Sequence, residues 1–147
     1  MIIALVAGGS VVALFFYNLD IGRYGDEPTT AWAMARFFTV LTNIAVFVTF
    51  ATAALRRDGI GASWIAALTL AMILVGAVFH ALLSGITTYV GLGQWANQGL
   101  HTFVPIACFV WWVVFAPKRT LEYGDLPMFV VWPCAYVAYA LARGAQD

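Results

Sequence analysis

The chain has 147 residues, of which 63% are hydrophobic and only 10% are charged, and its seven basic and seven acidic side chains give no net charge. Soluble domains carry about a quarter charged residues, so this composition excludes an ordinary water-soluble protein. A neutral chain also lacks the basic patch that a nucleic-acid partner requires. Crossing a bilayer several times uses most of the length, so residues 1–147 are predicted to form a single integral membrane domain.

Short charged clusters separate five long apolar stretches. A membrane-spanning helix needs roughly 20 apolar residues. Four stretches reach that length, and the fifth is shorter but begins with Pro127 and ends in the interfacial pattern Tyr136, Tyr139 and Arg143. We therefore expect an all-α polytopic transmembrane helix bundle with five spans. The expected spans are residues 1–19, 37–55, 63–85, 96–116 and 127–142.

The first apolar stretch lies at the N-terminus, where a secretory signal peptide would be found. It lacks a basic start and has no small-x-small cleavage site before Tyr17 and Asn18, so it is predicted to be a retained helix. Its small residues 8–10 (Gly-Gly-Ser) would let another helix approach closely.

Five spans place the second and fourth loops on the side of the N-terminus. These two loops carry Arg56, Arg57, Lys118 and Arg119, and the opposite side carries Arg23, Arg36 and Arg143. Because cytoplasmic loops are enriched in basic residues, this bias favours a cytoplasmic N-terminus.

Polar residues within the spans concentrate at one end of the bundle. The second span begins at the first loop, the third span ends at the third loop, and the fourth span begins there, so all three ends lie in the same leaflet. This leaflet would contain Arg36, Thr39, Thr42, Asn43, His80, Ser84, Asn97, Gln98, His101 and Thr102. The sequence therefore predicts a polar pocket inside the bundle and on one side of the membrane.

Helical spacing groups these residues further. Arg36, Thr39 and Asn43 follow an i, i+3, i+7 pattern and share a helix face. Asn97 and His101 are four residues apart and share another. Pro105 cannot donate to the carbonyl of His101, so that carbonyl is expected to be free.

The third span contributes Gly76 and His80 on one face, where the glycine would let a neighbouring helix approach. Ionisable residues within a membrane span indicate function by default, although each histidine could instead be a hydrogen-bonded core residue. Arg36 could be an interfacial anchor, Asn43 could link helices, and Thr42 could bond its own helix. The two histidines have no third ligand at helical spacing, so no metal or other cofactor is expected.

Few catalytic mechanisms are compatible with this sequence. It has no G-x-S-x-G, H-E-x-x-H or phosphate-binding loop motif, and it has only three serines. A threonine hydroxyl activated by a histidine remains feasible, because imidazole can take the hydroxyl proton near neutral pH. Asn43, His80, Asn97 or Gln98 could then donate hydrogen bonds to an oxyanion.

Three segments carry a family resemblance: R-F-F-T-V-L-T-N (36–43), V-F-H-A-L-L (78–83) and W-A-N-Q-G-L-H-T-F-V-P (95–105). With the Tyr-rich last helix, they resemble the androgen-induced-gene family of membrane proteins, and most closely its bacterial six-helix relatives. Animal members are threonine hydrolases that cleave fatty acid esters of hydroxy fatty acids within the membrane. The resemblance implies Thr39 as nucleophile and His101 as base, in a bacterial plasma membrane.

Other polar residues of the pocket are expected to support this chemistry. Asn43, His80, Asn97 and Arg36 are candidates for binding substrate, stabilising the oxyanion or orienting the imidazole, and Thr42 is a second candidate hydroxyl. The expected partners are membrane lipids and an amphiphilic ester substrate. The family usually has a sixth helix, so a missing helix or a second copy of the chain could complete the bundle.

Two other functions fit the composition. A non-catalytic bundle could bind a lipid head group in the polar pocket or serve as a structural membrane subunit. A proton-coupled transporter could use His80 and His101, but no acidic residue lies within the spans and no pair of broken helices is evident.

Overall fold

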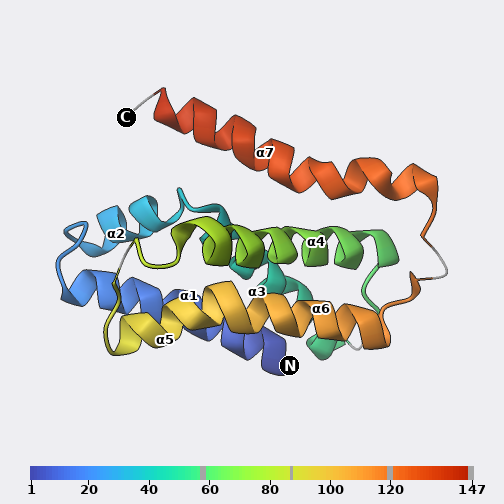
Figure 1. The fold of residues 1–147 in the computed structure, drawn as a ribbon, viewed down its shortest axis with the longest axis horizontal. Helices are drawn as coiled ribbons and strands as arrows, with labels where there is room; N and C mark the ends of the chain where they lie inside the picture. The colour runs from blue at the N-terminus through green and yellow to red at the C-terminus, as the bar shows by residue number, and fades with distance from the viewer. Residues whose placement is uncertain (57–58, 87, 119–120, 146–147) are drawn as a thin grey trace.

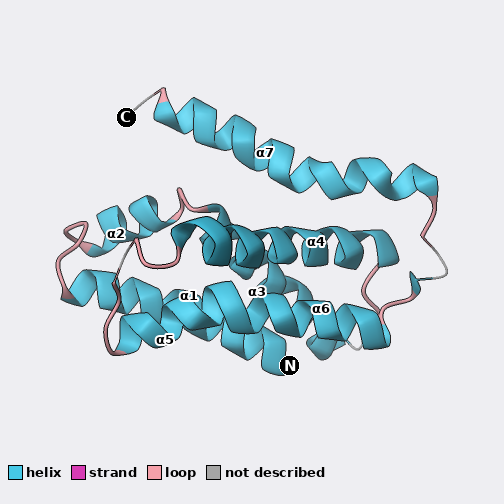
Figure 2. Cartoon of the chain, in the orientation of Figure 1, coloured by secondary structure: helices cyan, strands magenta, loops and turns pink. Residues whose placement is uncertain are grey.

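The structure, a computed structural model, describes residues 1–56, 59–86, 88–118 and 121–145. It is 82% helical, and the described residues contain no strand (Figures 1 and 2). Five helical segments in these residues are long and apolar enough to cross a membrane. The predicted all-α transmembrane bundle is therefore confirmed, and the protein is an integral membrane protein. Arg57 and Arg119, which contributed to the predicted orientation, lie outside the described residues.

The spans lie within a few residues of the expected ranges. The first two are α1 (Ile2–Asp20) and α3 (Phe38–Arg56), and the third is α4 (Ala62–Val78) continued by η1 (Phe79–Leu83). The fourth begins earlier than expected, because α5 (Leu92–Gln98), η2 (Gly99–Phe103) and α6 (Val104–Phe115) form one continuous helical segment. The last consists of the short turn η4 (Tyr123–Asp125) and α7 (Leu126–Gly144), which has Pro127 in its first turn, as expected.

A short helix in the first loop, α2 (Glu27–Met34), was not predicted. The Asp26 carboxylate caps it by accepting a hydrogen bond from the Thr29 backbone N–H at 3.0 Å. Hydrogen bonding by Thr29 lowers the pKa of Asp26 below its ordinary value. Pro28 also suits the first turn. Because α2 is too short to span a membrane, hydropathy alone does not reveal it, whereas the Asp-x-Pro pattern could have done so.

Two π-helical turns, η1 and η2, carry the two histidines. The Ser84 N–H bonds to the Phe79 carbonyl at 2.7 Å, and the Val104 N–H bonds to the Gly99 carbonyl, both five residues back. Such turns contain an extra residue, which changes the direction of the side chains. Gly76 packs against η2: a Cβ on Gly76 would lie 3.3 Å from the His101 carbonyl oxygen. The expected close approach at Gly76 is therefore confirmed.

The first helix packs tightly on its neighbours through small residues. A Cβ on Gly8 would lie 2.8 Å from the Phe47 ring of α3, so the predicted close approach at this residue is confirmed. Ser10 lies against Gly99 of η2, and a Cβ on Gly99 would clash with the Ser10 hydroxyl and lie 2.9 Å from its Cβ. These contacts fix η2 against α1.

The last helix lies along α4 as an outer element of the bundle (Figure 1). None of the residues in its most apolar window is buried. Hydrogen bonds attach it instead: Asp125 accepts from Ser63 at 2.6 Å, and Trp132 Nε1 donates to Thr42 at 3.0 Å. Tyr139 donates to the Ala35 carbonyl at 3.2 Å, near the C-terminal end of α7.

The substitution Gly99→Ala is expected to lower the free energy of unfolding in detergent by about 1–3 kcal/mol, because the new methyl group collides with Ser10. This is the usual cost of overpacking. Thermal unfolding followed by circular dichroism would measure this. Gly9→Ala is the matched control, since no atom lies within 4 Å of its added Cβ. The double variant Ser10→Gly/Gly99→Ala should recover stability, and failure to recover would contradict the proposed collision.

Candidate functional site

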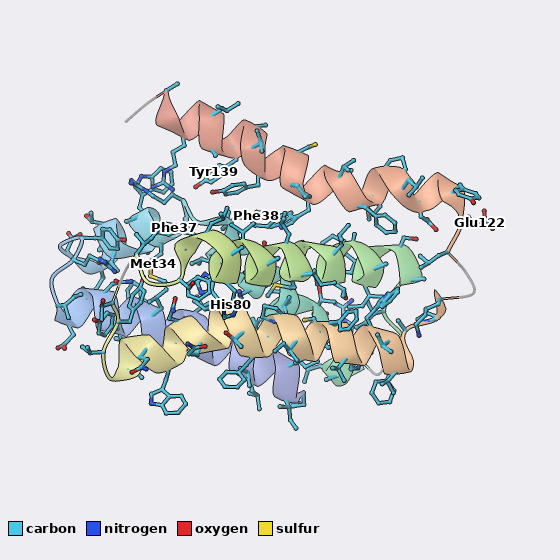
Figure 3. The ribbon with its side chains drawn as sticks, in the orientation of Figure 1. Met34, Phe37, Phe38, His80, Glu122 and Tyr139 are labelled. Atoms are coloured by element: carbon cyan, nitrogen blue, oxygen red, sulfur yellow. The ribbon has the colours of Figure 1, made fainter. Side chains whose placement is uncertain are left out.

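A cavity of about 250 Å³ opens at the polar end of the bundle. Thr39, Asn97 and His101 line it, so the structure brings the two predicted catalytic residues into one cavity. Most of the wall is apolar and comes from Leu14, Met34, Phe37, Val40, Phe79, Leu83, Ile86 and Leu100. Figure 3 shows Met34 and Phe37 at this end, near the part of the chain that carries His80.

The His101 ring is held in one orientation. Its Nδ1 lies 3.0 Å from the Asn97 carbonyl oxygen. A carbonyl oxygen only accepts, so Nδ1 carries the proton and the neutral ring has its lone pair on Nε2. The Phe79 ring stacks on the imidazole, with centroids 4.1 Å apart and an interplanar angle of 22°. His101 thus has the tautomer that a general base acting through Nε2 requires.

Thr39 lies in the first turn of α3. Its carbonyl oxygen accepts a hydrogen bond from the Asn43 amide at 2.9 Å, and the residue lines the cavity. No hydrogen bond joins the Thr39 hydroxyl to His101 in the part of the chain that the structure describes. Catalytic hydrogen bonds are often longer without substrate and shorten when it binds, so this arrangement is compatible with catalysis.

Asn43 is buried and links α3 to η2. Its amide nitrogen donates to the Thr39 carbonyl and, at 3.3 Å, to the Leu100 carbonyl. Both N–H groups are therefore in use, and its Oδ1 is buried with no hydrogen-bond partner. In this arrangement Asn43 joins the segments that carry Thr39 and His101 and has no free donor for an oxyanion. The Asn97 amide, which lines the cavity, is the better candidate.

Thr42 and Arg36 lie away from this cavity. The Thr42 hydroxyl donates to the Phe38 carbonyl at 2.7 Å and accepts from Trp132 Nε1, so it bonds its own helix and anchors α7. Arg36 lines a separate cavity beside α7. Its carbonyl oxygen accepts from the Tyr136 hydroxyl at 2.7 Å.

His80 lies on the other side of His101, in a separate groove of about 320 Å³ between α4 and α6. Its Nε2 lies 3.0 Å from the Thr102 hydroxyl, which donates to Gln98 Oε1 at 2.8 Å. Because the Thr102 proton points to Gln98, Nε2 of His80 is the donor in their bond. His80 therefore connects the two π-helical turns, and it does not line the cavity that Thr39 and His101 share.

Among the lining residues that were not predicted, three carry polar groups and one stacks on His101: Asn18, Tyr24 and Tyr89, and Phe79. Asn18 is a buried polar residue at the end of α1, so the rule that intramembrane polar groups indicate function could have identified it. Tyr24 and Tyr89 lie in loops, and nothing in the hydropathy pattern marks them. Phe79 is placed on His101 by η1, which the sequence does not reveal.

Among the described residues, no group of three or more His, Cys, Asp or Glu side chains could hold a metal ion. Comparisons of the chain with protein-family models, with curated proteins and with solved structures find no match. The resemblance to the androgen-induced-gene family therefore rests on the short motifs alone.

The two histidines are expected to have opposite neutral tautomers, with the proton on Nδ1 in His101 and on Nε2 in His80. Nitrogen NMR of the protein in detergent with ¹⁵N-labelled histidine would distinguish the two rings. The variant His80→Gln assigns the signals by leaving only His101. A proton on Nε2 of His101 above neutral pH would contradict the hydrogen bond to Asn97.

Proposed function

We propose that the protein is an intramembrane lipid ester hydrolase that uses Thr39 as nucleophile and His101 as general base. The observation that carries the proposal is the shared cavity: a threonine hydroxyl and an imidazole with its lone pair on Nε2 line one largely apolar space. The family resemblance supplies the substrate class, fatty acid esters of the hydroxy fatty acid type. An acyl chain would lie along the apolar wall.

The proposed reaction has two stages. The Thr39 oxygen attacks the ester carbonyl while His101 Nε2 takes the hydroxyl proton. The tetrahedral intermediate collapses, the acyl–oxygen bond to the alcohol breaks, and His101 returns the proton to the departing alkoxide. Water, activated by the same imidazole, then cleaves the threonine ester. The N-terminal turn of α3 favours negative charge near Thr39, and the Asn97 amide could donate to the oxyanion.

The proposed setting is a bacterial plasma membrane with the N-terminus in the cytoplasm, which follows from the resemblance and from the basic loops. Membrane lipids would surround the bundle. A sixth helix or a second copy of the chain would cover the outer face of α7, where Val130, Val137 and Leu141 are exposed.

A lipid-binding bundle without catalysis is the second candidate. It is favoured by the lack of a hydrogen bond between Thr39 and His101 in the described structure. In that case the cavity would hold an amphiphile, and His101 would serve only as a hydrogen-bonding group.

The proposal is tested with a fluorophosphonate lipid probe, applied to the purified protein in detergent and located by mass spectrometry. We expect an adduct on Thr39 that is lost in Thr39→Val and in His101→Ala. Turnover of a hydroxy fatty acid ester should fall to background in Thr39→Val and by about 10²-fold or more in His101→Ala, because a general base typically contributes 10²–10⁴.

Thr102→Val is the matched control, because it removes another threonine hydroxyl beside a histidine but outside the cavity. It should retain both the adduct and the turnover. An adduct on Thr42 would move the nucleophile to that residue. Saturable binding of a non-hydrolysable ether analogue, with no adduct and no turnover in folded protein, would favour the lipid-binding bundle.

A further inference from the structure

Three polar residues line one end of the cavity that contains Thr39 and His101. Asn18 lies in the last turn of α1, and Tyr24 and Tyr89 lie in the first and third loops. Because successive spans run in opposite directions, these two loops lie on the same side of the membrane. The three residues therefore form the end of the cavity nearest to the membrane surface, which we call its mouth.

Arg23 lies at this mouth and contacts two of its residues. Its Nη1 lies 3.4 Å from Asn18 Oδ1 and 3.5 Å from the Tyr89 hydroxyl oxygen. Its guanidinium carbon lies 5.5 Å from the centroid of the Tyr89 ring. Both partners are neutral, so these contacts hold the guanidinium beside the cavity without cancelling its charge.

Three carboxylates lie near Arg23 in the sequence. Asp26 accepts the Thr29 backbone N–H and caps α2. Neither it nor Asp20 nor Glu27 forms an ion pair with Arg23 in the part of the chain that the structure describes. A guanidinium has five N–H donors, and only Nη1 of Arg23 takes part in the two contacts at the mouth. The N–H groups of Nη2 and Nε therefore remain for a ligand.

Asn18 offers a second donor at the mouth. Only 3% of its surface is exposed. Its Oδ1 lies against Arg23, whereas its amide nitrogen has no hydrogen-bond partner among the described residues. A buried donor without a partner is unfavourable, because it has lost its hydrogen bonds to water. A ligand in the cavity that accepts a hydrogen bond from Asn18 would remove this cost.

Tyr89 is held in place although it belongs to a loop. Its ring packs on the Tyr17 ring of α1, with centroids 5.8 Å apart. Tyr17 in turn lies against Gly93 of α5, where an added Cβ would lie 2.7 Å from the Tyr17 ring. The glycine therefore allows the packing that fixes Tyr89, and with it Arg23, at the mouth.

The mouth and the cavity wall together suit an anionic amphiphile. The Arg23 guanidinium can bond both oxygens of a carboxylate, because its N–H groups lie in one plane. The Asn18 amide can donate a further hydrogen bond to the same group. Behind the mouth the wall is largely apolar, with Leu14, Phe37 and Leu83 among its residues, and it suits a hydrocarbon chain.

We propose that Arg23 and Asn18 bind the free carboxylate of the amphiphilic substrate at the mouth of the cavity. The hydrocarbon chain then lies along the apolar wall, and the ester group lies between Thr39 and His101. Because the carboxylate belongs to the substrate, this role rests on the proposed hydrolase function. It favours esters that keep a free carboxylate over neutral esters such as acylglycerols.

The experiment compares two non-hydrolysable ether analogues of a hydroxy fatty acid ester by isothermal titration calorimetry, with the purified protein in an uncharged detergent. One analogue has a free carboxylate, and the other is its methyl ester. We expect the acid to bind roughly tenfold or more tightly than the methyl ester, the gain typical of one charge-assisted hydrogen bond. Equal affinities would overturn the proposal.

Two variants test the residues. Arg23→Gln should lower the affinity for the acid by roughly tenfold or more but not the affinity for the methyl ester, because only the acid needs the charge. Asn18→Asp should act in the same way, because its new carboxylate pairs with Arg23 and repels the substrate. If Asn18→Asp does not fold, Arg23→Gln decides alone.

Arg56→Gln is the matched control, since it removes an exposed arginine in the last turn of α3, at the other end of the bundle. It should leave both affinities unchanged. A loss of acid binding in Arg56→Gln equal to that in Arg23→Gln would contradict a specific role of Arg23.

The binding measurement does not depend on hydrolysis, so the two proposals fail separately. Acid-selective binding that requires Arg23, with no adduct on Thr39 and no turnover, would reject the hydrolase and keep the carboxylate site in a lipid-binding bundle. An adduct and turnover, with equal affinities for the acid and the methyl ester, would keep the hydrolase and reject the carboxylate site.

Discussion

The structure depends on one constraint, the absence of water in the bilayer core, which obliges buried polar groups to find partners within the protein. The amide nitrogen of Asn43 meets this constraint by donating to two backbone carbonyls, one in its own helix and one in η2, whereas its Oδ1 is buried without a hydrogen-bond partner. These bonds join the segment that carries Thr39 to the segment that carries His101. The relative position of these two segments therefore depends on the two hydrogen bonds that the Asn43 amide nitrogen donates.

The same constraint shapes the irregular turns. Pro105 removes one backbone donor, and η2 accommodates the change with an extra residue in its turn. Gly76 then allows α4 to approach the His101 carbonyl, and the Asn97 carbonyl fixes the imidazole from the preceding turn. The Asn97 carbonyl and the stacked Phe79 ring, which come from two spans, thus hold the imidazole in one orientation.

Much of the fold was predictable, because hydropathy reports directly on membrane spans. The concentration of polar residues at one end also followed from counting spans, and the shared cavity of Thr39 and His101 agrees with it. Other features depend on contacts between distant residues. The sequence does not show that Trp132 donates a hydrogen bond to the Thr42 hydroxyl or that Phe79 stacks on His101. Nor does it show that Asn18 lines the cavity. The helix α2 was missed because it is short, although Asp26 and Pro28 mark its start.

The attachment of α7 has a consequence for the membrane around it. Asp125 bonds Ser63 near one end of the helix, and Arg143 bonds Trp32 near the other. At a rise of about 1.5 Å per residue these anchors are roughly 27 Å apart, close to the thickness of the hydrocarbon core, about 30 Å. A helix fixed at both ends cannot tilt or slide to match a thicker or thinner bilayer without breaking one anchor. The bilayer would have to deform instead, so the hydrogen bonds at the two ends of α7 restrict the hydrophobic thickness that this protein tolerates.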